Sequence, residues 1–108
     1  MRVELLWWEG CPSYPEALED LRRVLNEEGL DPDIVEMREI VSDDQAKEER
    51  FFGSPTIRIE GVEAIPPGEG DPLGLSCRVY RLRDGRPSPT PDVEDLRDAV
   101  RRSAYAGR

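Results

Sequence analysis

The stretch VELLWWEGCPSYPEAL, residues 3–18, predicts a strand that runs into a helix. Residues 3–8 are β-prone and mostly apolar on both faces, which is typical of a central strand covered on each side. Ser13 and Glu16 fit a capping box, and apolar residues then recur at helical spacing until Gly29. Cys11 lies between the two elements, so the sequence predicts a thiol at a strand-to-helix junction.

The length and net charge of the chain limit the classes of protein to which it can belong. Its 108 residues predict a single domain over residues 1–108. An excess of 24 acidic over 15 basic side chains, a net charge of -9, argues against nucleic-acid and membrane-surface partners. The apolar block ending at Trp8 is too short for a signal peptide or a membrane span, so we expect a cytoplasmic protein with reduced cysteines.

The absence of histidine limits the possible chemistry. It excludes Cys-His and Ser-His-Asp catalysis within this chain and removes the commonest transition-metal ligand. We therefore expect no cofactor, and the two cysteines become the main candidates for reactivity.

The rest of the chain alternates strand and helix signals. After the first helix we expect a strand over 34–40 near a sheet edge and a short helix from 42 to about 53. A strand over 54–61 and a long Pro- and Gly-rich loop over 62–76 should follow. The chain should then form a strand over 77–82 and a helix from 90 to about 104, before a frayed tail, 105–108. The order βαβα-ββα predicts an α/β fold with a four-stranded mixed sheet and helices on both faces.

This order, with Cys11 after the first strand and Pro55 opening the third, resembles the thioredoxin fold over nearly the whole chain. The resemblance implies a reactive cysteine in the motif at residues 11–14 and a cis-proline at Pro55 beside it. A strand antiparallel to the first begins where the first ends, so the two residues should meet at one sheet edge. The resemblance also implies that a cis Ser54–Pro55 bond leaves backbone groups free to pair with an extended peptide or a small thiol substrate.

A narrower resemblance rests on the segments 53–56 and 71–81. Both are similar to a poorly characterised bacterial thioredoxin-like family, some members of which are labelled as similar to alkylmercury lyase. Organomercurial lyases use two cysteines and an acidic residue, and their first cysteine opens a C-x-x-D motif. Tyr14 stands where that motif has its aspartate.

The candidate site centres on Cys11, with Tyr14 and Pro55 as further catalytic candidates. We expect a substrate groove formed by Pro12, Ser54, Thr56 and Trp8. A thiolate near a helix start gains from the free N–H groups and the dipole, whereas neighbouring Glu9 would raise the thiol pKa.

Tyr14 occupies the position of the second cysteine of a CxxC motif, which excludes the ordinary CxxC disulfide cycle. A single thiol still forms mixed disulfides or a sulfenic acid. Tyr14 then either donates a hydrogen bond to the sulfur or packs its ring over the loop.

Cys77 is the candidate second thiol. If the fourth strand begins at Cys77 and runs parallel to the first, Cys77 starts at the opposite end of the sheet as a buried core residue. The long loop before it can instead redirect the chain and bring Cys77 close to Cys11.

Three hypotheses stay open. The first is a monothiol redox or thiol-transfer protein acting through Cys11 on a small thiol, a disulfide or a protein partner. The second is a soft-metal or organomercurial-type binder using Cys11 and Cys77, since thiolates select ions such as Cu(I) or Hg(II). The third is a non-catalytic scaffold that binds partners around Pro55.

Overall fold

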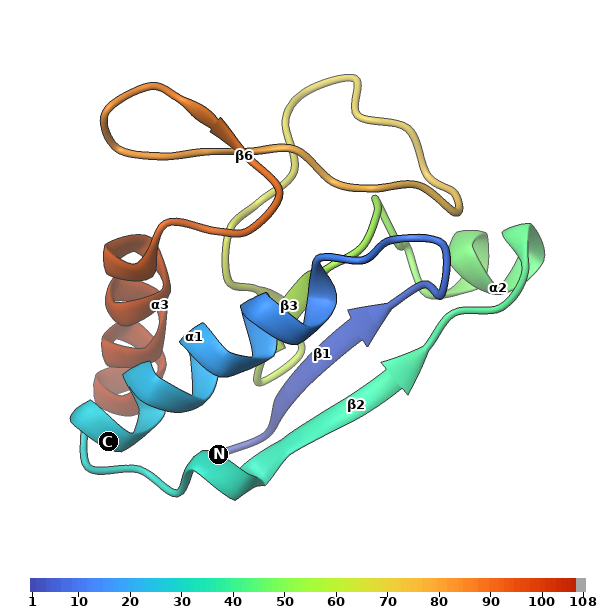
Figure 1. Cartoon of the computed structure of the whole chain (residues 1–108). Helices are drawn as coiled ribbons and strands as arrows, with labels where there is room; N and C mark the ends of the chain where they lie inside the picture. Colours follow the sequence, from blue (N-terminus) through green and yellow to red (C-terminus); the bar gives the residue numbers. More distant parts are fainter. Residues whose placement is uncertain (107–108) are drawn as a thin grey trace.

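A computed structural model of the chain describes residues 1–106. Its main sheet has four strands in the order β2-β1-β3-β4 (Figure 1), which are β1 Val3–Trp7, β2 Val35–Glu39, β3 Thr56–Ile59 and β4 Val62–Glu63. β1 pairs parallel to β2 and antiparallel to β3. The predicted mixed α/β sheet, with the first strand inside and the second at an edge, is confirmed.

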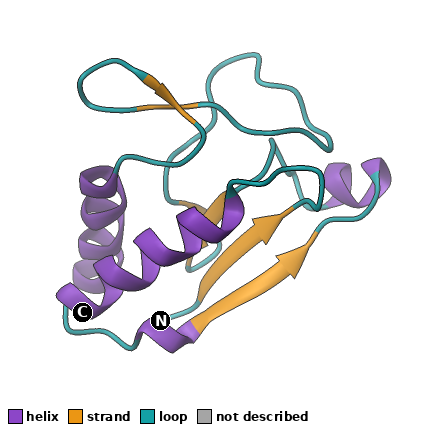
Figure 2. Ribbon diagram, in the orientation of Figure 1, coloured by secondary structure: helices purple, strands orange, loops and turns teal. Residues whose placement is uncertain are grey.

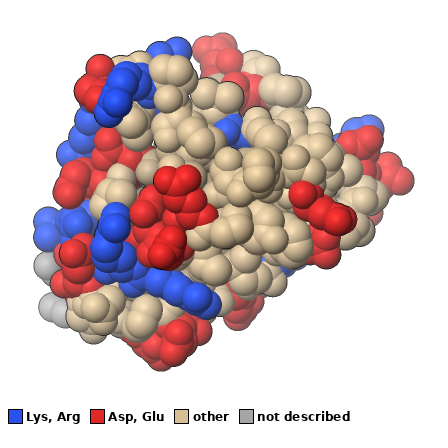
Figure 3. All heavy atoms as spheres, viewed as in Figure 1, with Lys and Arg blue, Asp and Glu red and all other residues tan. Residues whose placement is uncertain are grey.

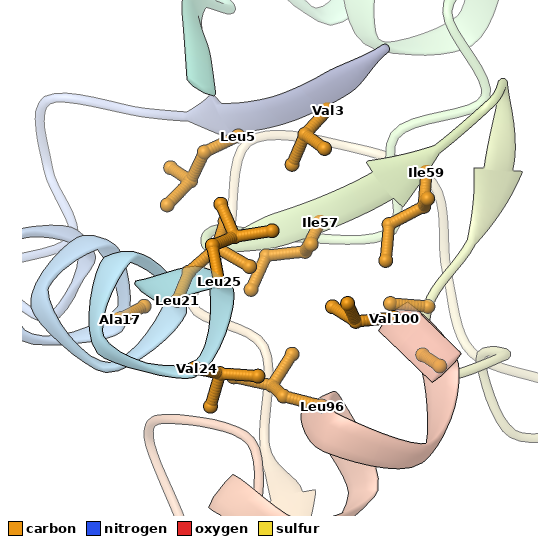
Figure 4. Close-up of a cluster of buried hydrophobic side chains, with 12 residues drawn as sticks. Val3, Leu5, Ala17, Leu21, Val24, Leu25, Ile57, Ile59, Leu96 and Val100 are labelled. Atoms are coloured by element: carbon orange, nitrogen blue, oxygen red, sulfur yellow. The ribbon is translucent and has the colours of Figure 1, made fainter. Parts of the chain in front are cut away.

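Helices cover both faces of this sheet. α1 (Tyr14–Glu27) and α3 (Val93–Ala106) pack together on one side, while α2 (Asp43–Glu48) follows β2 at the far end, and the short 3-10 helix η1 (Pro32–Ile34) leads into β2. Leu5 points into the cluster formed with α1 and α3 (Figure 4), and adjacent Leu6 joins a second cluster with Ala46 and Phe51. Successive strand residues face opposite sides, so β1 is buried on both.

The predicted fourth strand is wrong. The predicted strand over 77–82 contributes only β5 (Tyr80–Arg81), which pairs with β6 (Pro87–Ser88) in a separate hairpin (Figure 2). β4 lies inside the predicted loop 62–76 and completes the main sheet. Glu60 and Gly61 both have positive φ, 54° and 79°, and their tight turn folds the chain back directly onto β3.

Several helix ends also differ from the predictions. Ser13 precedes α1, but its side chain makes no capping hydrogen bond, so the predicted capping box is wrong. Ser42 does cap α2, accepting the Gln45 N–H at 3.1 Å, although α2 ends at Glu48. α3 continues through Ala106, beyond its predicted end at about 104, and residues 107–108 of the predicted frayed tail lie outside the described residues.

The surface over α1 and α3 is densely charged. Figure 3 shows acidic and basic side chains intermixed there, beside a broad area without charge. Arg97 contacts Glu27 at 3.0 Å and Arg101 contacts Glu28 at 2.6 Å, which joins the two helices. None of the α-helices within residues 1–106 is both long and apolar enough to cross a lipid bilayer.

Candidate functional site

Cys11 lies in the turn that joins β1 to α1. The Cys11 N–H donates to the Trp8 carbonyl at 3.0 Å, which closes the turn. A Cβ atom on Gly10 would fall 2.4 Å from the Trp8 indole, so only glycine fits beneath that ring. The turn points the Cys11 side chain inward, where it is only 1% exposed.

The Pro55 loop reaches Cys11, as predicted from the antiparallel pairing. The Ser54–Pro55 bond is cis. Leu6 near the end of β1 pairs with Thr56 at the start of β3, which brings the loop to the end of β1. The Cys11 thiol donates to the Ser54 carbonyl oxygen, with an Sγ to O distance of 3.3 Å.

Three residues of the predicted substrate groove and its Pro55 neighbourhood are buried. Ser54, Pro55 and Thr56 are buried, and the backbone groups of Ser54 are already paired. The Ser54 N–H donates to the Ser76 carbonyl and the Ser54 carbonyl accepts the Arg78 N–H, both at 2.8 Å. The chain's own segment 76–78 therefore occupies the backbone groups of Ser54 that were expected to be free.

Cys77 is next to Cys11 and not at the opposite end of the sheet. It forms an isolated parallel bridge with Ser54, and its side chain is exposed, so the prediction of a buried core cysteine is wrong. The reason is that residues 77–79 lie outside the main sheet. The long loop before them brings them next to the Pro55 turn. The two thiols are free and close enough for each to shift the pKa of the other.

The two thiols have opposite pKa shifts. Burial raises the pKa of Cys11, but stabilisation of the ionised sulfur by the Ser13 backbone N–H, the Cys77 thiol and the hydroxyls of Ser54 and Ser13 outweighs it, so this pKa lies below its usual value. The pKa of Cys77 is raised, chiefly because its thiol donates to the Cys11 sulfur, and to a lesser extent by burial. Cys11 is therefore the more acidic thiol of the pair and Cys77 the less acidic.

Two serines, Ser13 and Ser54, help to lower the pKa of the Cys11 thiol. Ser13 does not cap α1, and its N–H and hydroxyl instead favour the Cys11 thiolate. The buried Ser54 hydroxyl oxygen lacks a hydrogen-bond partner among the described residues, which leaves it available to an ionised Cys11. The sequence signal of Ser13 is the same for both roles, which explains why it was assigned to helix capping.

Residues after Cys77 hold the Pro55 loop in place. The Tyr80 hydroxyl donates to the Pro55 carbonyl, and the Thr56 hydroxyl donates to the Gly53 carbonyl at 2.6 Å. The Arg78 guanidinium lies 4.4 Å from the centre of the Tyr80 ring, within range of a cation–π contact. Sequence reasoning missed Arg78 and Tyr80, because their alternation indicated only a strand.

The remaining predicted residues lie around this pair without joining its hydrogen bonds. Tyr14 stacks on Trp7, with ring centroids 4.4 Å apart and an interplanar angle of 25°, which is the packing alternative considered for it. Trp8 is half-buried against the cluster containing Leu6, and Pro12 is exposed.

A shallow hollow lies beside the exposed Cys77 thiol. It encloses about 290 Å³ and has an almost wholly apolar lining from Cys77, Arg78, Val79, Pro87, Ser88 and Pro89. A larger hollow of about 450 Å³ lies beside α2 and β3, but its lining is mostly charged and includes neither cysteine.

The site offers two sulfur donors to a ligand. Within residues 1–106, no three Cys, Asp or Glu side chains form a group that could hold a metal ion. Comparison of the chain with protein-family models, curated proteins and solved structures gave no match.

Proposed function

We propose that this protein is a thioredoxin-like thiol protein that exchanges thiols and disulfides at a site formed by Cys11 and Cys77. The observation that supports this most is that two free thiols meet at Ser54: the Cys11 thiol donates to the Ser54 carbonyl, and Cys77 forms a backbone bridge with the same residue. Tyr14 occupies the position of a CxxC resolving cysteine. Cys77 supplies a second thiol from a distant part of the chain.

The geometry suits disulfide exchange. A thiolate attacks one sulfur of a disulfide, and a second thiol then displaces the attached group. The net reaction converts a substrate disulfide and two protein thiols into two substrate thiols and one Cys11–Cys77 disulfide. The donors around Cys11 raise its thiolate fraction at neutral pH, which favours this chemistry.

A second candidate function uses the same two sulfurs as ligands. Paired thiolates suit a soft ion such as Cu(I) or Hg(II), which accepts two ligands, better than zinc, which requires four. The contact between Cys11 and Cys77, without a third ligand group in residues 1–106, favours this alternative over other metal sites.

Thiol stoichiometry tests the proposed function. The fully reduced protein is mixed with excess hydroxyethyl disulfide, and the released thiol and the intact mass are measured. Wild type should release two thiols per chain and lose two hydrogen atoms, whereas Cys11→Ser and Cys77→Ser should retain a mixed disulfide. A wild-type protein that keeps two adducts or remains reduced contradicts disulfide exchange. If added Hg(II) instead protects both thiols from an alkylating reagent, and no disulfide forms, the result would support the soft-ion alternative.

A further inference from the structure

The two thiols differ in their access to solvent, and this difference assigns them different roles within the proposed function. We propose that Cys77 forms the mixed disulfide with the substrate, that Cys11 resolves it, and that the substrate is an uncharged disulfide with an apolar group. The inference rests on the proposed function and reverses the order expected from the position of Cys11 after β1.

Burial separates the two roles. Cys11 is 1% exposed, enclosed by the turn from Trp8, the start of α1 and the Ser54 carbonyl. Cys77 is exposed and lines the apolar hollow, whereas Cys11 does not. Thiol–disulfide exchange requires access to the attacked sulfur, so an external disulfide meets Cys77 first. Once Cys77 carries the adduct, its sulfur is still next to Cys11.

The hollow indicates the substrate class. Val79, which is 73% exposed, lines it together with Pro87 and Pro89. The Arg78 guanidinium is buried, donates to the Ile65 carbonyl and pairs with the Glu63 carboxylate at 3.5 Å, so it is not free to bind an anion. The net charge of -9 also repels anionic disulfides. A volume of about 290 Å³ accommodates one small apolar or aromatic group.

The reaction balances without another reactant. The Cys77 proton passes to water, and the Cys77 thiolate attacks one sulfur of the substrate disulfide, releasing a substrate thiolate. That thiolate takes the proton from Cys11. The Cys11 thiolate then attacks the Cys77 sulfur of the mixed disulfide and expels the second substrate thiolate, which is protonated by water. The two cysteines are oxidised and the substrate disulfide is reduced.

Single-cysteine variants test the order of attack. Cys11→Ser and Cys77→Ser are each reacted with the uncharged aromatic disulfide dithiodipyridine, and their rates are normalised to the thiolate fraction from each pH profile. The proposal expects Cys77 to react at least about tenfold faster than Cys11 in folded protein, and at a similar rate in denaturant. Equal or faster labelling of Cys11 in folded Cys77→Ser overturns it. Failure of wild type to form the internal disulfide would instead contradict the proposed function.

A matched pair of surface variants tests the hollow. Val79→Ser should slow dithiodipyridine labelling of Cys77 several-fold and leave hydroxyethyl disulfide labelling unchanged. Val62→Ser is the control, because Val62 is 67% exposed on β4 and does not line the hollow. Equal effects of both variants, or no effect of Val79→Ser, overturn the assignment of an apolar substrate.

Discussion

The Cys11 thiol lies 3.3 Å from the Ser54 carbonyl oxygen, which also accepts the Arg78 N–H at 2.8 Å. One carbonyl thus contacts both thiol-bearing segments: the turn after β1 and the segment that presents Cys77. Because this carbonyl immediately precedes Pro55, the position of both thiols depends on the Pro55 loop. The following predictions test that dependence.

Gly53→Ala should displace the Cys77 segment. Gly53 has φ +127°, and a Cβ there would lie 3.0 Å from the Arg78 backbone nitrogen, so alanine would strain the backbone and press against the segment that carries Cys77. We expect a loss of about 1–3 kcal/mol in unfolding free energy, together with faster alkylation of Cys11. Urea denaturation and site-resolved alkylation measure the two effects.

Gly61→Ala is the matched control. Gly61 also has a positive φ, +79°, but a Cβ there meets no atom within 4 Å. It should reduce stability without changing the accessibility of Cys11. If the two variants have the same effect on alkylation, Gly53 does not position the Cys77 segment.

Ser13→Ala should raise the pKa of Cys11 without uncapping α1. Its hydroxyl lowers that pKa and makes no capping hydrogen bond, while the Ser13 backbone N–H remains in the variant. We therefore expect a partial upward shift, measured by thiolate absorbance against pH. Ser42→Ala provides the comparison, because it removes the α2 cap and should cost about 1 kcal/mol without shifting the thiol pKa.

The thiol pair should stabilise the fold over a limited pH range. The lowered pKa of Cys11 contributes stability that is present above its unfolded value and lost as pH falls through its folded value. The raised pKa of Cys77 contributes stability that is present below its unfolded value and lost as pH rises through its folded value. Urea denaturation in reductant should show the wild-type advantage over the double serine variant peaking near the ordinary thiol pKa. An advantage that is constant with pH contradicts this coupling.

Tyr80→Phe should loosen the Pro55 loop. It removes the hydroxyl that donates to the buried Pro55 carbonyl, and leaving that acceptor unpaired should cost about 1–3 kcal/mol. Tyr14→Phe is the control, since stacking on Trp7 needs only the ring. Tyr14→Phe should change the unfolding free energy by less than about 0.5 kcal/mol. It should leave the pKa of Cys11 unchanged. A marked rise of the Cys11 pKa in Tyr14→Phe would show that the Tyr14 phenol donates a hydrogen bond to the Cys11 sulfur.

The location of Cys11 was predictable from the sequence because its signals are local. An apolar strand, a turn and a helix start follow one another within residues 3–18, and the order of strands then brings the Pro55 loop to the same edge. The edge position of β2 also followed from its charged residues.

The location of Cys77 was not predictable in this way. It depends on a bridge to Ser54 across an irregular segment, and no periodic pattern encodes such long-range contacts. The two-residue β4 is too short to leave an alternating pattern. Ser13 shows a related limit, because a serine at a helix start serves equally well as a cap or as a donor to a neighbouring sulfur.

The central claim is that Cys11 and Cys77 form one site, and titration of the two cysteines tests it most directly. The Cβ chemical shifts of carbon-13-labelled cysteines are followed against pH in wild type and in each single serine variant. The account predicts two separated ionisations, with Cys11 below and Cys77 above the ordinary thiol pKa, and a downward shift of the Cys77 pKa in Cys11→Ser. Two independent titrations at the ordinary thiol pKa, unchanged by substitution of the other cysteine, would contradict it.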